Sequence, residues 1–362
     1  MHKAYAATQD RGRLVFALTL VAVFVGGWSN GAQSGPRTLL KLQSMPAAFG
    51  QNGARFAWVG DRVVVADLVS GERTKLARGG TEYETPVAVA GSTVVWLQVV
   101  GGNSKIDTLR AAAPGRERRF GRWGDDDYYL GSGPRLGGIA ADRKRLAYAL
   151  YRLTSDQRRS DDCYEKGICT WHVTGGGTFL VSPGSLARRR ILPPASAVAI
   201  HGNTVAVATL ARGARYTGKA QIVLLNLADG SRHSIGKSAR VERLLLDRDL
   251  LVAVIHQDLD DEKPPIVRVW SVKTRQLIAR FRLPRGTRFE HFGLAGQRIV
   301  FQAFSRGQAI FSMDLRSGLR KVVAHPHSNF LYGPWVWRGR AVWVEQTYGR
   351  HPGSVVRSAP LR

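Results

Sequence analysis

The sequence predicts an all-β protein: a seven-bladed β-propeller of four-stranded antiparallel blades. Beyond residue 35, no sustained stretch places apolar residues at the i, i+3, i+4 and i+7 spacing of a helix. Short runs rich in Val, Ile, Leu and aromatic residues recur instead between turn residues, which is the pattern of strands. The third observation is a group of such strands that repeats along the chain.

The repeated unit has two apolar strands joined by a tight turn, a variable loop, a third strand ending in Asp/Asn-Leu-x-x-Gly, and a basic fourth strand. Its clearest copies are residues 197–230 and 292–318. Equivalent turns recur seven times at intervals of about 40 to 60 residues, the scale expected of four-stranded blades. These turns lie at Gly53, Gly91, Asp142, Gly202, Arg248, Gly296 and Gly339.

The second strands of the units are apolar in succession, as in Leu251-Val-Ala-Val-Ile255. Strands of this kind are buried on both faces, and blades stacked around an axis provide that burial. The last unit stops at its third strand, residues 354–357. We expect residues 38–42 to supply the missing fourth strand and close the ring, because open strand edges aggregate. A β-sandwich or an open solenoid is the alternative topology.

Residues 1–32 are predicted to form a signal peptide. Positive charges at Lys3, Arg11 and Arg13 precede an apolar run over residues 14–25, and small and polar residues follow. That run is short for a membrane-spanning helix, which needs about 20 apolar residues, although an uncleaved anchor is the alternative. Residues 36–362 are predicted to be a single propeller domain that is secreted, periplasmic or otherwise extracytoplasmic.

The two cysteines of the chain, Cys163 and Cys169, lie in an enlarged loop predicted at residues 152–177. An exported protein meets an oxidising environment, in which such a pair closes a small loop as a disulfide. A metal site is the alternative, but His172 is only a third donor and no fourth stands at ligand spacing. We therefore predict a disulfide and expect neither a metal nor another cofactor.

The chain is strongly basic, with 53 Lys and Arg, 27 Asp and Glu, and a formal net charge of +26. An excess of this size bears on partners and solubility, and contact with an anionic cell envelope is one interpretation of it. The alternative is that arginine is abundant because of genomic base composition, since Arg far outnumbers Lys. The arginines are scattered through every segment, whereas a nucleic-acid surface usually shows a patch or stripe. Nucleic acid is therefore not the expected partner, and the protein is expected to be a monomer.

Residues 296–302 and 309–318 resemble the repeat of TolB-like periplasmic and secreted propellers, which runs through turn, apolar strand, short loop and Asp-Leu-x-x-Gly. Weaker copies lie at residues 61–71 and 222–230. The Pro-Asp-Gly turn typical of that family is replaced here by Ala-Gly-Ser, His-Gly-Asn and Ala-Gly-Gln. The resemblance implies the fold. Such propellers mostly bind proteins or glycans, though some are hydrolases or lyases, so the resemblance alone implies no reaction.

Acidic, aromatic and imidazole residues gather in the loops predicted to project from one face of the propeller. Second-to-third-strand loops and between-blade loops share that face. Aromatic rings and carboxylates suit a polar ligand, so we expect a protein or polysaccharide there. The candidate ligand-binding residues are Asp126, Tyr128, Asp161, Trp171, His172, His256, Asp258, Asp260, His291, His327 and Tyr348.

No catalytic residue is predicted, because no nucleophile, zinc, phosphate-loop or dinucleotide motif is present. Each histidine lacks a Ser, Cys or carboxylate partner identifiable by spacing. We therefore predict a non-enzymatic binding scaffold. The alternative is a glycan hydrolase or lyase that uses rim carboxylates, in which two acids would lie about 5 to 10 Å apart around one cleft. Its candidates are Asp126, Asp161, Asp258 and Asp260.

Overall fold

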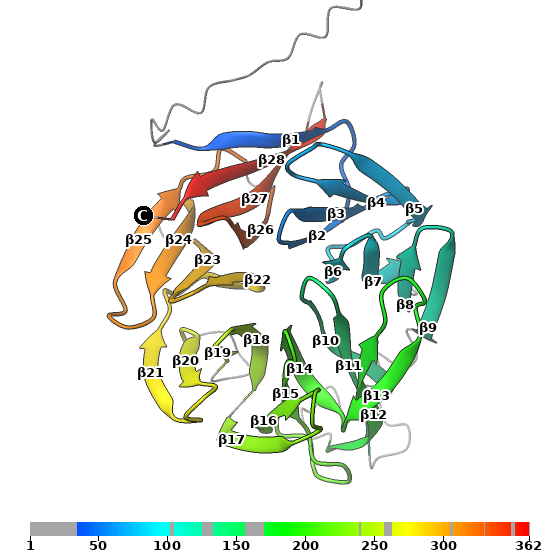
Figure 1. The fold of residues 1–362 in the computed structure, drawn as a ribbon, viewed down its shortest axis with the longest axis vertical. Helices are drawn as coiled ribbons and strands as arrows, with labels where there is room; N and C mark the ends of the chain where they lie inside the picture. The colour runs from blue at the N-terminus through cyan, green and yellow to red at the C-terminus, as the bar shows by residue number, and fades with distance from the viewer. Residues whose placement is uncertain are drawn as a thin grey trace, which may run out of the picture. The chain divides into compact units, whose positions relative to one another are not determined.

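β-Strands are the regular elements of this protein. The computed structural model describes residues 35–101, 105–124, 133–155, 170–238, 240–256, 263–304, 307–328, 330–348 and 352–361. These residues form 28 strands and no helix, and the described strands pair into seven four-stranded sheets. The sheets stand as blades around a central axis (Figure 1). The predicted seven-bladed propeller is therefore confirmed.

Each of the first four blades begins at the axis and proceeds outward. Blade 1 consists of β2 (Ala48–Asn52), β3 (Arg55–Val59), β4 (Arg62–Asp67) and β5 (Arg73–Arg78). Blade 2 consists of β6 (Val87–Ala90), β7 (Thr93–Val100), β8 (Ile106–Ala113) and β9 (Arg116–Trp123). Blade 3 consists of β10 (Gly133–Ala141), β11 (Leu146–Ser155), β12 (Trp171–Val181) and β13 (Arg188–Leu192). Blade 4 consists of β14 (Ala195–His201), β15 (Thr204–Thr209), β16 (Ala220–Asn226) and β17 (Arg232–Ser238).

Two further blades follow the same order, and the seventh differs in its outer strand. Blade 5 consists of β18 (Val241–Asp247), β19 (Leu250–Ile255), β20 (Ile266–Ser271) and β21 (Leu277–Arg282). Blade 6 consists of β22 (Thr287–Ala295), β23 (Arg298–Phe304), β24 (Gln308–Asp314) and β25 (Arg320–Ala324). Blade 7 consists of β26 (Phe330–Trp337), β27 (Arg340–Thr347), β28 (Gly353–Pro360) and β1 (Arg37–Leu42).

Ring closure joins the first and last strands of the described chain. β1 pairs antiparallel with β28, from Arg37 opposite Ser358 to Leu42 opposite Ser354. The strand order in this sheet is β1-β28-β27-β26, so an N-terminal strand forms the outer edge of a C-terminal blade. The prediction that residues 38–42 complete the last blade is confirmed.

The core consists of apolar layers between neighbouring blades. One cluster combines Leu153 of blade 3 with Ile222 of blade 4 and Trp270 of blade 5, each at most 6% exposed. The second strands are covered on both faces, as shown by β19, in which residues 251–255 are all buried. Consecutive Val, Leu and Ile residues suit this position because both faces of the strand lose contact with water.

The Asp-Leu-x-x-Gly motif forms the turn between the third and fourth strands. Asp67 Oδ1 accepts hydrogen bonds from the backbone N–H groups of Val69 (2.7 Å) and Ser70 (3.2 Å). In the equivalent turn of blade 6, Asp314 Oδ1 accepts hydrogen bonds from the backbone N–H groups of Arg316 and Ser317. The motif ends in a glycine with positive φ, 75° at Gly71 and 72° at Gly318, a region that residues with a Cβ rarely enter.

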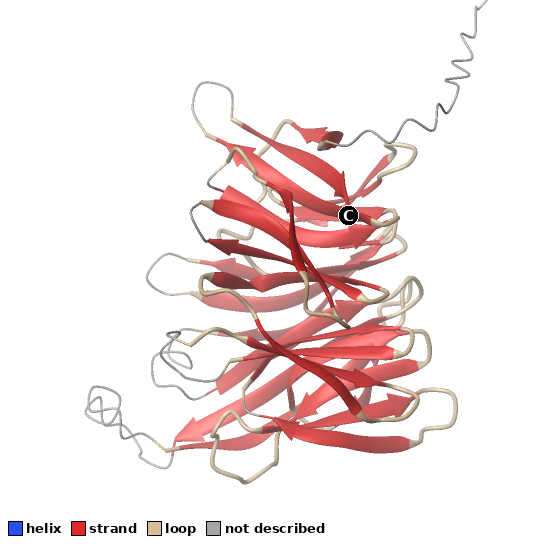
Figure 2. Cartoon of the chain, turned by 90° about the vertical axis from the view of Figure 1, so that its left-hand side faces the viewer, coloured by secondary structure: helices blue, strands red, loops and turns tan. Residues whose placement is uncertain are grey.

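The connections of each blade alternate between two opposite faces of the ring, because its strands run antiparallel across the thickness of the ring (Figure 2). We call the side of the second-to-third-strand and between-blade connections the loop face, and the other side the turn face. The predicted enlarged loop at residues 152–177 is shorter than expected, since β11 extends to Ser155 and β12 begins at Trp171. Within the described residues, no helix has the length and apolar character required to cross a membrane.

Candidate functional site

The innermost strands of three neighbouring blades are each interrupted by a bulge. The residue pairing shifts once in β10, once in β14 and once in β18. A bulge leaves one residue outside the ladder and re-aims its side chain, and such bulges are common beside functional sites. The extra residues here are Gly137 in β10, Ser196 in β14 and Glu242 in β18.

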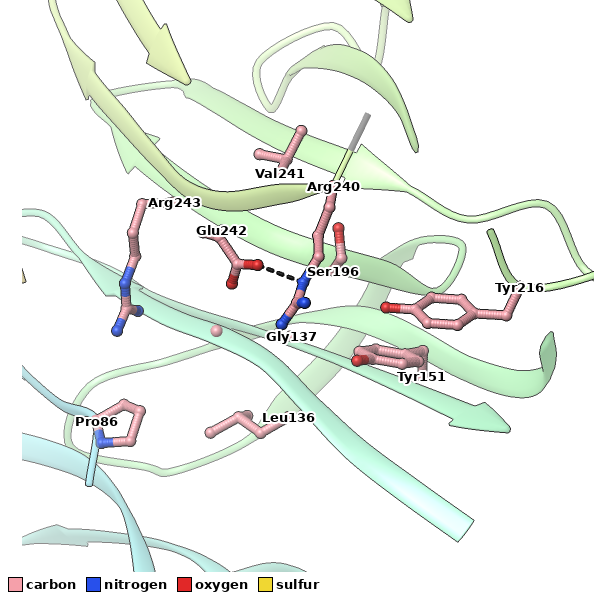
Figure 3. A pocket seen from close by; sticks show the side chains of 11 residues that line it. Pro86, Leu136, Gly137, Tyr151, Ser196, Tyr216, Arg240, Val241, Glu242 and Arg243 are labelled. Carbon is pink, nitrogen blue, oxygen red and sulfur yellow. Dashed lines mark ion pairs between the residues drawn. The ribbon is translucent and has the colours of Figure 1, made fainter. Parts of the chain in front are cut away.

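All three extra residues line one cavity of about 250 Å³ on the inner side of blades 3 to 5. Figure 3 shows its arrangement. Tyr151 of β11 and Tyr216 of the β15–β16 connection lie together at one end, and Arg243 of β18 and Pro86 lie toward the other. Arg240, which directly precedes β18, extends between them. We call this space the central cavity.

Two guanidinium groups and one carboxylate determine the charge of the central cavity. Arg240 Nε forms an ion pair with Glu242 Oε1, and the two side chains are 43% and 25% exposed. Arg243 lies on the other side of Glu242 (Figure 3). The lining therefore carries more positive than negative charge. Arginine presents a planar fork of N–H donors that matches a carboxylate or phosphate, so the cavity suits an anionic group.

The two tyrosines form a stacked aromatic pair, with ring centroids 5.8 Å apart and an angle of 20° between the ring planes. Burial raises the pKa of Tyr151, and the neighbouring Tyr216 raises it further. Tyr151 therefore stays a neutral phenol near pH 7 and keeps a hydroxyl hydrogen to donate. The pair supplies hydrogen-bonding groups without adding a second negative charge to the cavity.

A short interblade contact holds Tyr216 in place. The segment before it pairs with the start of β12: Gly213 N–H donates to the Val173 carbonyl oxygen over 2.8 Å. Tyr216 N–H donates to the carbonyl oxygen of Trp171. The His172 ring nitrogen Nδ1 lies 3.3 Å from the Gly213 carbonyl oxygen. The loop-face connection of blade 4 is thus tied to blade 3, and this tie positions the phenol over the cavity.

A second group of residues lies where blade 6 meets the connection that precedes blade 2. The pairing of β22 with β23 jumps between Thr287 and Phe292, so several residues leave the ladder there. One of them, His291, forms an ion pair with Glu84, with 3.0 Å between Nε2 and Oε1. The His291 ring packs on Trp335 of β26, with 5.1 Å between centroids. We call these residues the Glu84–His291 cluster.

Tyrosines and a buried glutamine extend this cluster into blade 7. The Tyr332 hydroxyl donates to Gln346 Oε1 over 3.3 Å, and the Tyr348 hydroxyl donates to the same atom over 3.4 Å. Gln346 Nε2 in turn donates to the Pro46 carbonyl oxygen over 2.7 Å. Burial, and then the negative charge of Glu84, raise the pKa of Tyr332 to about 12. Tyr348 remains 59% exposed on the loop face.

The sequence-predicted site residues fall into separate groups. Trp171 and His172 support Tyr216, while His291 and Tyr348 belong to the second cluster or its extension. His256 is 3% exposed directly after β19, and its backbone N–H donates to the Arg240 carbonyl oxygen over 3.0 Å. His327 is exposed between β25 and β26. The other predicted residues lie outside the described ranges: Asp126, Tyr128, Asp161, Asp258, Asp260, Cys163 and Cys169.

The residues of the central cavity were not among the sequence predictions. Tyr151, Tyr216 and Glu242 are far apart in the chain, and only the order of the blades brings them together. The one local signal is the segment Arg240-Val-Glu-Arg243, in which two arginines flank an acid directly before an apolar strand. That pattern is common in a chain with so many arginines, so it could not single out the site.

Comparison with known proteins gives a fold and no family. No family model matches the chain, and no curated protein matches it. The solved structure of an oligogalacturonate lyase in complex with manganese is 10% identical, with a TM-score of 0.50, over 91% of this chain and 98% of that one. The fold is that of a β-propeller. At this identity the likeness extends to the fold alone.

Two further solved structures are similar over shorter stretches. The β-propeller domain of the Trilobed protease from Pyrococcus furiosus is 14% identical with a TM-score of 0.41, over 60% of this chain. The match spans 65% of that chain, which is less than two thirds of its length. A nidogen/laminin complex is 14% identical with a TM-score of 0.35, over 66% of this propeller chain and 80% of the other.

The described residues do not form a set of metal ligands. Among the residues that the structure describes, no group of three or more His, Cys, Asp and Glu side chains could hold a metal ion. Glu84 and His291 are two such donors in contact, but a stable site for most divalent metals needs three or more ligands.

Proposed function

We propose that this protein is an exported, non-enzymatic binding propeller that takes a protein or polysaccharide chain at its loop face. A carboxylate of that chain enters the central cavity. The observation that carries the proposal is the arrangement of Arg240 and Arg243 around a single acid, beside the Tyr151–Tyr216 pair. Export rests on the sequence of residues 1–32.

Binding would follow from competition between two carboxylates. Glu242 occupies the Arg240 guanidinium in the free protein, and an incoming carboxylate competes for the guanidinium groups of Arg240 and Arg243. Charge-assisted hydrogen bonds of this kind are roughly twice as strong as neutral ones, so the exchange favours ligands that bind both guanidinium groups. The Tyr151 and Tyr216 hydroxyls are placed to donate to neutral oxygens of the same ligand.

The charge of the cavity also favours binding over hydrolysis. A glycan hydrolase needs two carboxylates about 5 to 10 Å apart around one cleft. Within the described lining of the cavity, Glu242 is the single carboxylate, and it is paired with Arg240. The described lining therefore lacks the pair of acids that such a reaction requires.

The test is equilibrium binding of small ligands at about 0.5 M salt, where exposed charges are largely screened. The probes are the peptide acetyl-Ala-Glu-Ala-amide and trigalacturonate, each compared with its neutral counterpart, the Gln peptide and the methyl ester. We expect one of the two acidic probes to bind in preference to its neutral form, which identifies the source of the carboxylate. Equal binding of acidic and neutral forms, or cleavage of trigalacturonate, would overturn the proposal.

Two substitutions should change the affinity for the acidic probe in opposite directions. Arg243→Gln should weaken binding of the preferred acidic probe by about tenfold or more, the loss expected for one charge-assisted contact. Glu242→Gln should strengthen binding, because it removes the competing carboxylate from Arg240. Arg143→Gln removes an exposed charge from the turn face and serves as the matched control, with unchanged affinity. A loss of affinity in Glu242→Gln would contradict the competition model.

A further inference from the structure

The outermost strands of the blades concentrate the positive charge of the protein. These are β1, β5, β9, β13, β17, β21 and β25, the last strands of their sheets. Together they carry eighteen Lys and Arg and one acid, Glu117. The chain as a whole has 53 Lys and Arg, 27 Asp and Glu, and a net charge of +26. A small fraction of the residues thus carries most of the excess charge.

This charge faces water all around the circumference of the ring. All eighteen Lys and Arg side chains on the outer strands are exposed. The single acid, Glu117, is already paired with Arg110 of β8. In the described part of the chain, no outer-strand Lys or Arg forms an ion pair with an acid. We call this surface the basic belt.

Arginine side chains link neighbouring outer strands of the belt at three blade boundaries. The first residue of an outer strand donates to a carbonyl oxygen on the preceding blade in three places: Arg73 to Lys41 over 2.9 Å, Arg188 to Phe120 over 2.9 Å, and Arg232 to Ile191 over 3.3 Å. The outer strands therefore lie side by side at these boundaries. The belt is densest where β9, with four arginines, adjoins β13, with three.

Protection of sheet edges does not account for the belt. Charged side chains on an edge strand prevent pairing with other molecules, but either sign of charge serves that purpose. A ratio of eighteen cations to one anion, with arginine in the majority, indicates instead a surface for anions.

The shape and composition of the belt limit the classes of partner that it can bind. A flat membrane touches only an arc of a ring, whereas a flexible polymer can follow all of its blades. Proteins that bind single-stranded nucleic acid stack bases on exposed aromatic rings. The described outer strands offer no exposed aromatic side chain: Phe120 and Trp123 are buried, and Phe281 is half-buried. These features favour a linear polysaccharide whose anionic groups need only ionic contacts.

We propose that the basic belt binds a flexible anionic polysaccharide along the circumference of the propeller. Its carboxylate, sulfate or phosphate groups pair with the arginines of neighbouring outer strands. This site is separate from the central cavity, and it explains how the protein is held in an anionic envelope while the loop face remains open. Binding through many exposed charges falls steeply as salt concentration rises.

The test is affinity electrophoresis and titration of the full protein at about 0.05 M salt, where exposed charges act over distances above 10 Å. The probes are alginate, dextran sulfate, neutral dextran, a thymidine 30-mer and vesicles containing phosphatidylglycerol. The belt variant combines Arg119→Ala, Arg122→Ala and Arg189→Ala, three exposed residues of β9 and β13. The control variant combines Arg143→Ala, Lys144→Ala and Lys273→Ala, which removes the same charge from exposed turns.

We expect alginate or dextran sulfate to bind, and neutral dextran not to bind. The belt variant should bind the preferred polymer at least about tenfold more weakly and show a shallower salt dependence, while the control variant stays within about twofold. Equal losses in the two variants would overturn the belt in favour of net charge alone. Tighter binding of the thymidine 30-mer or the vesicles would overturn the choice of polysaccharide. Adding Arg243→Gln to both the belt variant and the control variant should leave the tenfold difference between them unchanged, which separates this site from the proposed function.

Discussion

His291 and Glu84 connect two parts of the ring that are not neighbours. His291 Nε2 lies 3.0 Å from Glu84 Oε1, although 207 positions separate the two residues in the chain. His291 belongs to β22 of blade 6, and Glu84 belongs to the connection between blades 1 and 2. The pair therefore joins blade 6 to the connection between blades 1 and 2, whose flanking strands belong to other sheets.

This link predicts an energetic coupling between the two residues. The double variant His291→Ala and Glu84→Gln should lose less free energy of unfolding than the sum of the losses in the two single variants. We expect a coupling free energy of about 0.5 to 1.5 kcal/mol, as for contacting partners in one network. Urea unfolding of the four proteins measures it. Glu82→Gln, in the same connection, is the control, and its effect should add to that of His291→Ala.

A second prediction concerns ring closure by β1. Leu42 is 5% exposed in the core between blade 7 and blade 1, whereas its neighbour Lys41 is exposed. Leu42→Ala should lower the free energy of unfolding by about 2 to 4 kcal/mol, because it leaves a cavity in a packed core. Lys41→Ala should change it by about 0.5 kcal/mol or less.

Hydrogen exchange shows whether the effect of Leu42→Ala is local. The amides of β28 that pair with β1, including Val356 opposite Leu40, should exchange faster in Leu42→Ala than in Lys41→Ala. If the two variants exchange equally, β1 contributes little to holding the ring closed.

The repeat made the fold predictable from the sequence. The seven turns placed at Gly53, Gly91, Asp142, Gly202, Arg248, Gly296 and Gly339 all join the first and second strands of a blade. Six of these seven residues have positive φ; the exception is Asp142. Asp142 instead accepts hydrogen bonds from the backbone N–H groups of Lys144 and Arg145. The turns are local structures, so their residues identify them without knowledge of the rest of the ring.

The sites could not be predicted in the same way. Glu242 and Tyr151 line one cavity because blades 3 and 5 face the same axis, and the bulge in β18 that exposes Glu242 leaves no mark in the sequence. The arginines looked scattered along the chain, since an outer strand recurs only once in each unit. Folding places the outer strands next to one another on the circumference, so that their arginines form the basic belt. Surfaces assembled across blades are thus hidden from a reading along the chain.

The glycines that end two equivalent turns allow a matched comparison. Gly230 and Gly318 have almost the same φ, 73° and 72°. A Cβ at Gly230 would meet nothing within 4 Å, whereas a Cβ at Gly318 would lie 2.7 Å from the Phe281 ring. Gly230→Ala should therefore cost only the backbone strain of about 1 to 2 kcal/mol. Gly318→Ala should cost about 1 to 3 kcal/mol more, because the ring must shift.

Thermal or urea unfolding of the two glycine variants tests this difference. The comparison is internally controlled, since the backbone geometry is shared and only the neighbouring side chain differs. Equal destabilisation would mean that the Phe281 ring moves aside without cost.

The turn carboxylates predict a pH dependence of stability. Asp314 Oδ1 accepts hydrogen bonds from Ser317 N–H over 2.8 Å and Arg316 N–H over 3.0 Å. These contacts with Ser317 and Arg316 lower the pKa of Asp314 below its ordinary value of 3.8. A carboxyl group whose pKa is lower in the folded than in the unfolded state stabilises the fold at pH values above the unfolded pKa. That contribution disappears as the pH falls through the folded pKa.

The variant Asp314→Asn keeps an acceptor oxygen in this turn and removes the charge. It should be less stable than the original protein at pH 7, and the gap should narrow once the pH falls below about 3.8, the ordinary pKa of the group. Urea midpoints measured from pH 7 to pH 3 provide the comparison. A gap that stayed constant over this range would show that the charge of Asp314 contributes nothing to the turn. The hydrogen-bond geometry alone would then account for the preference for aspartate in the repeated motif.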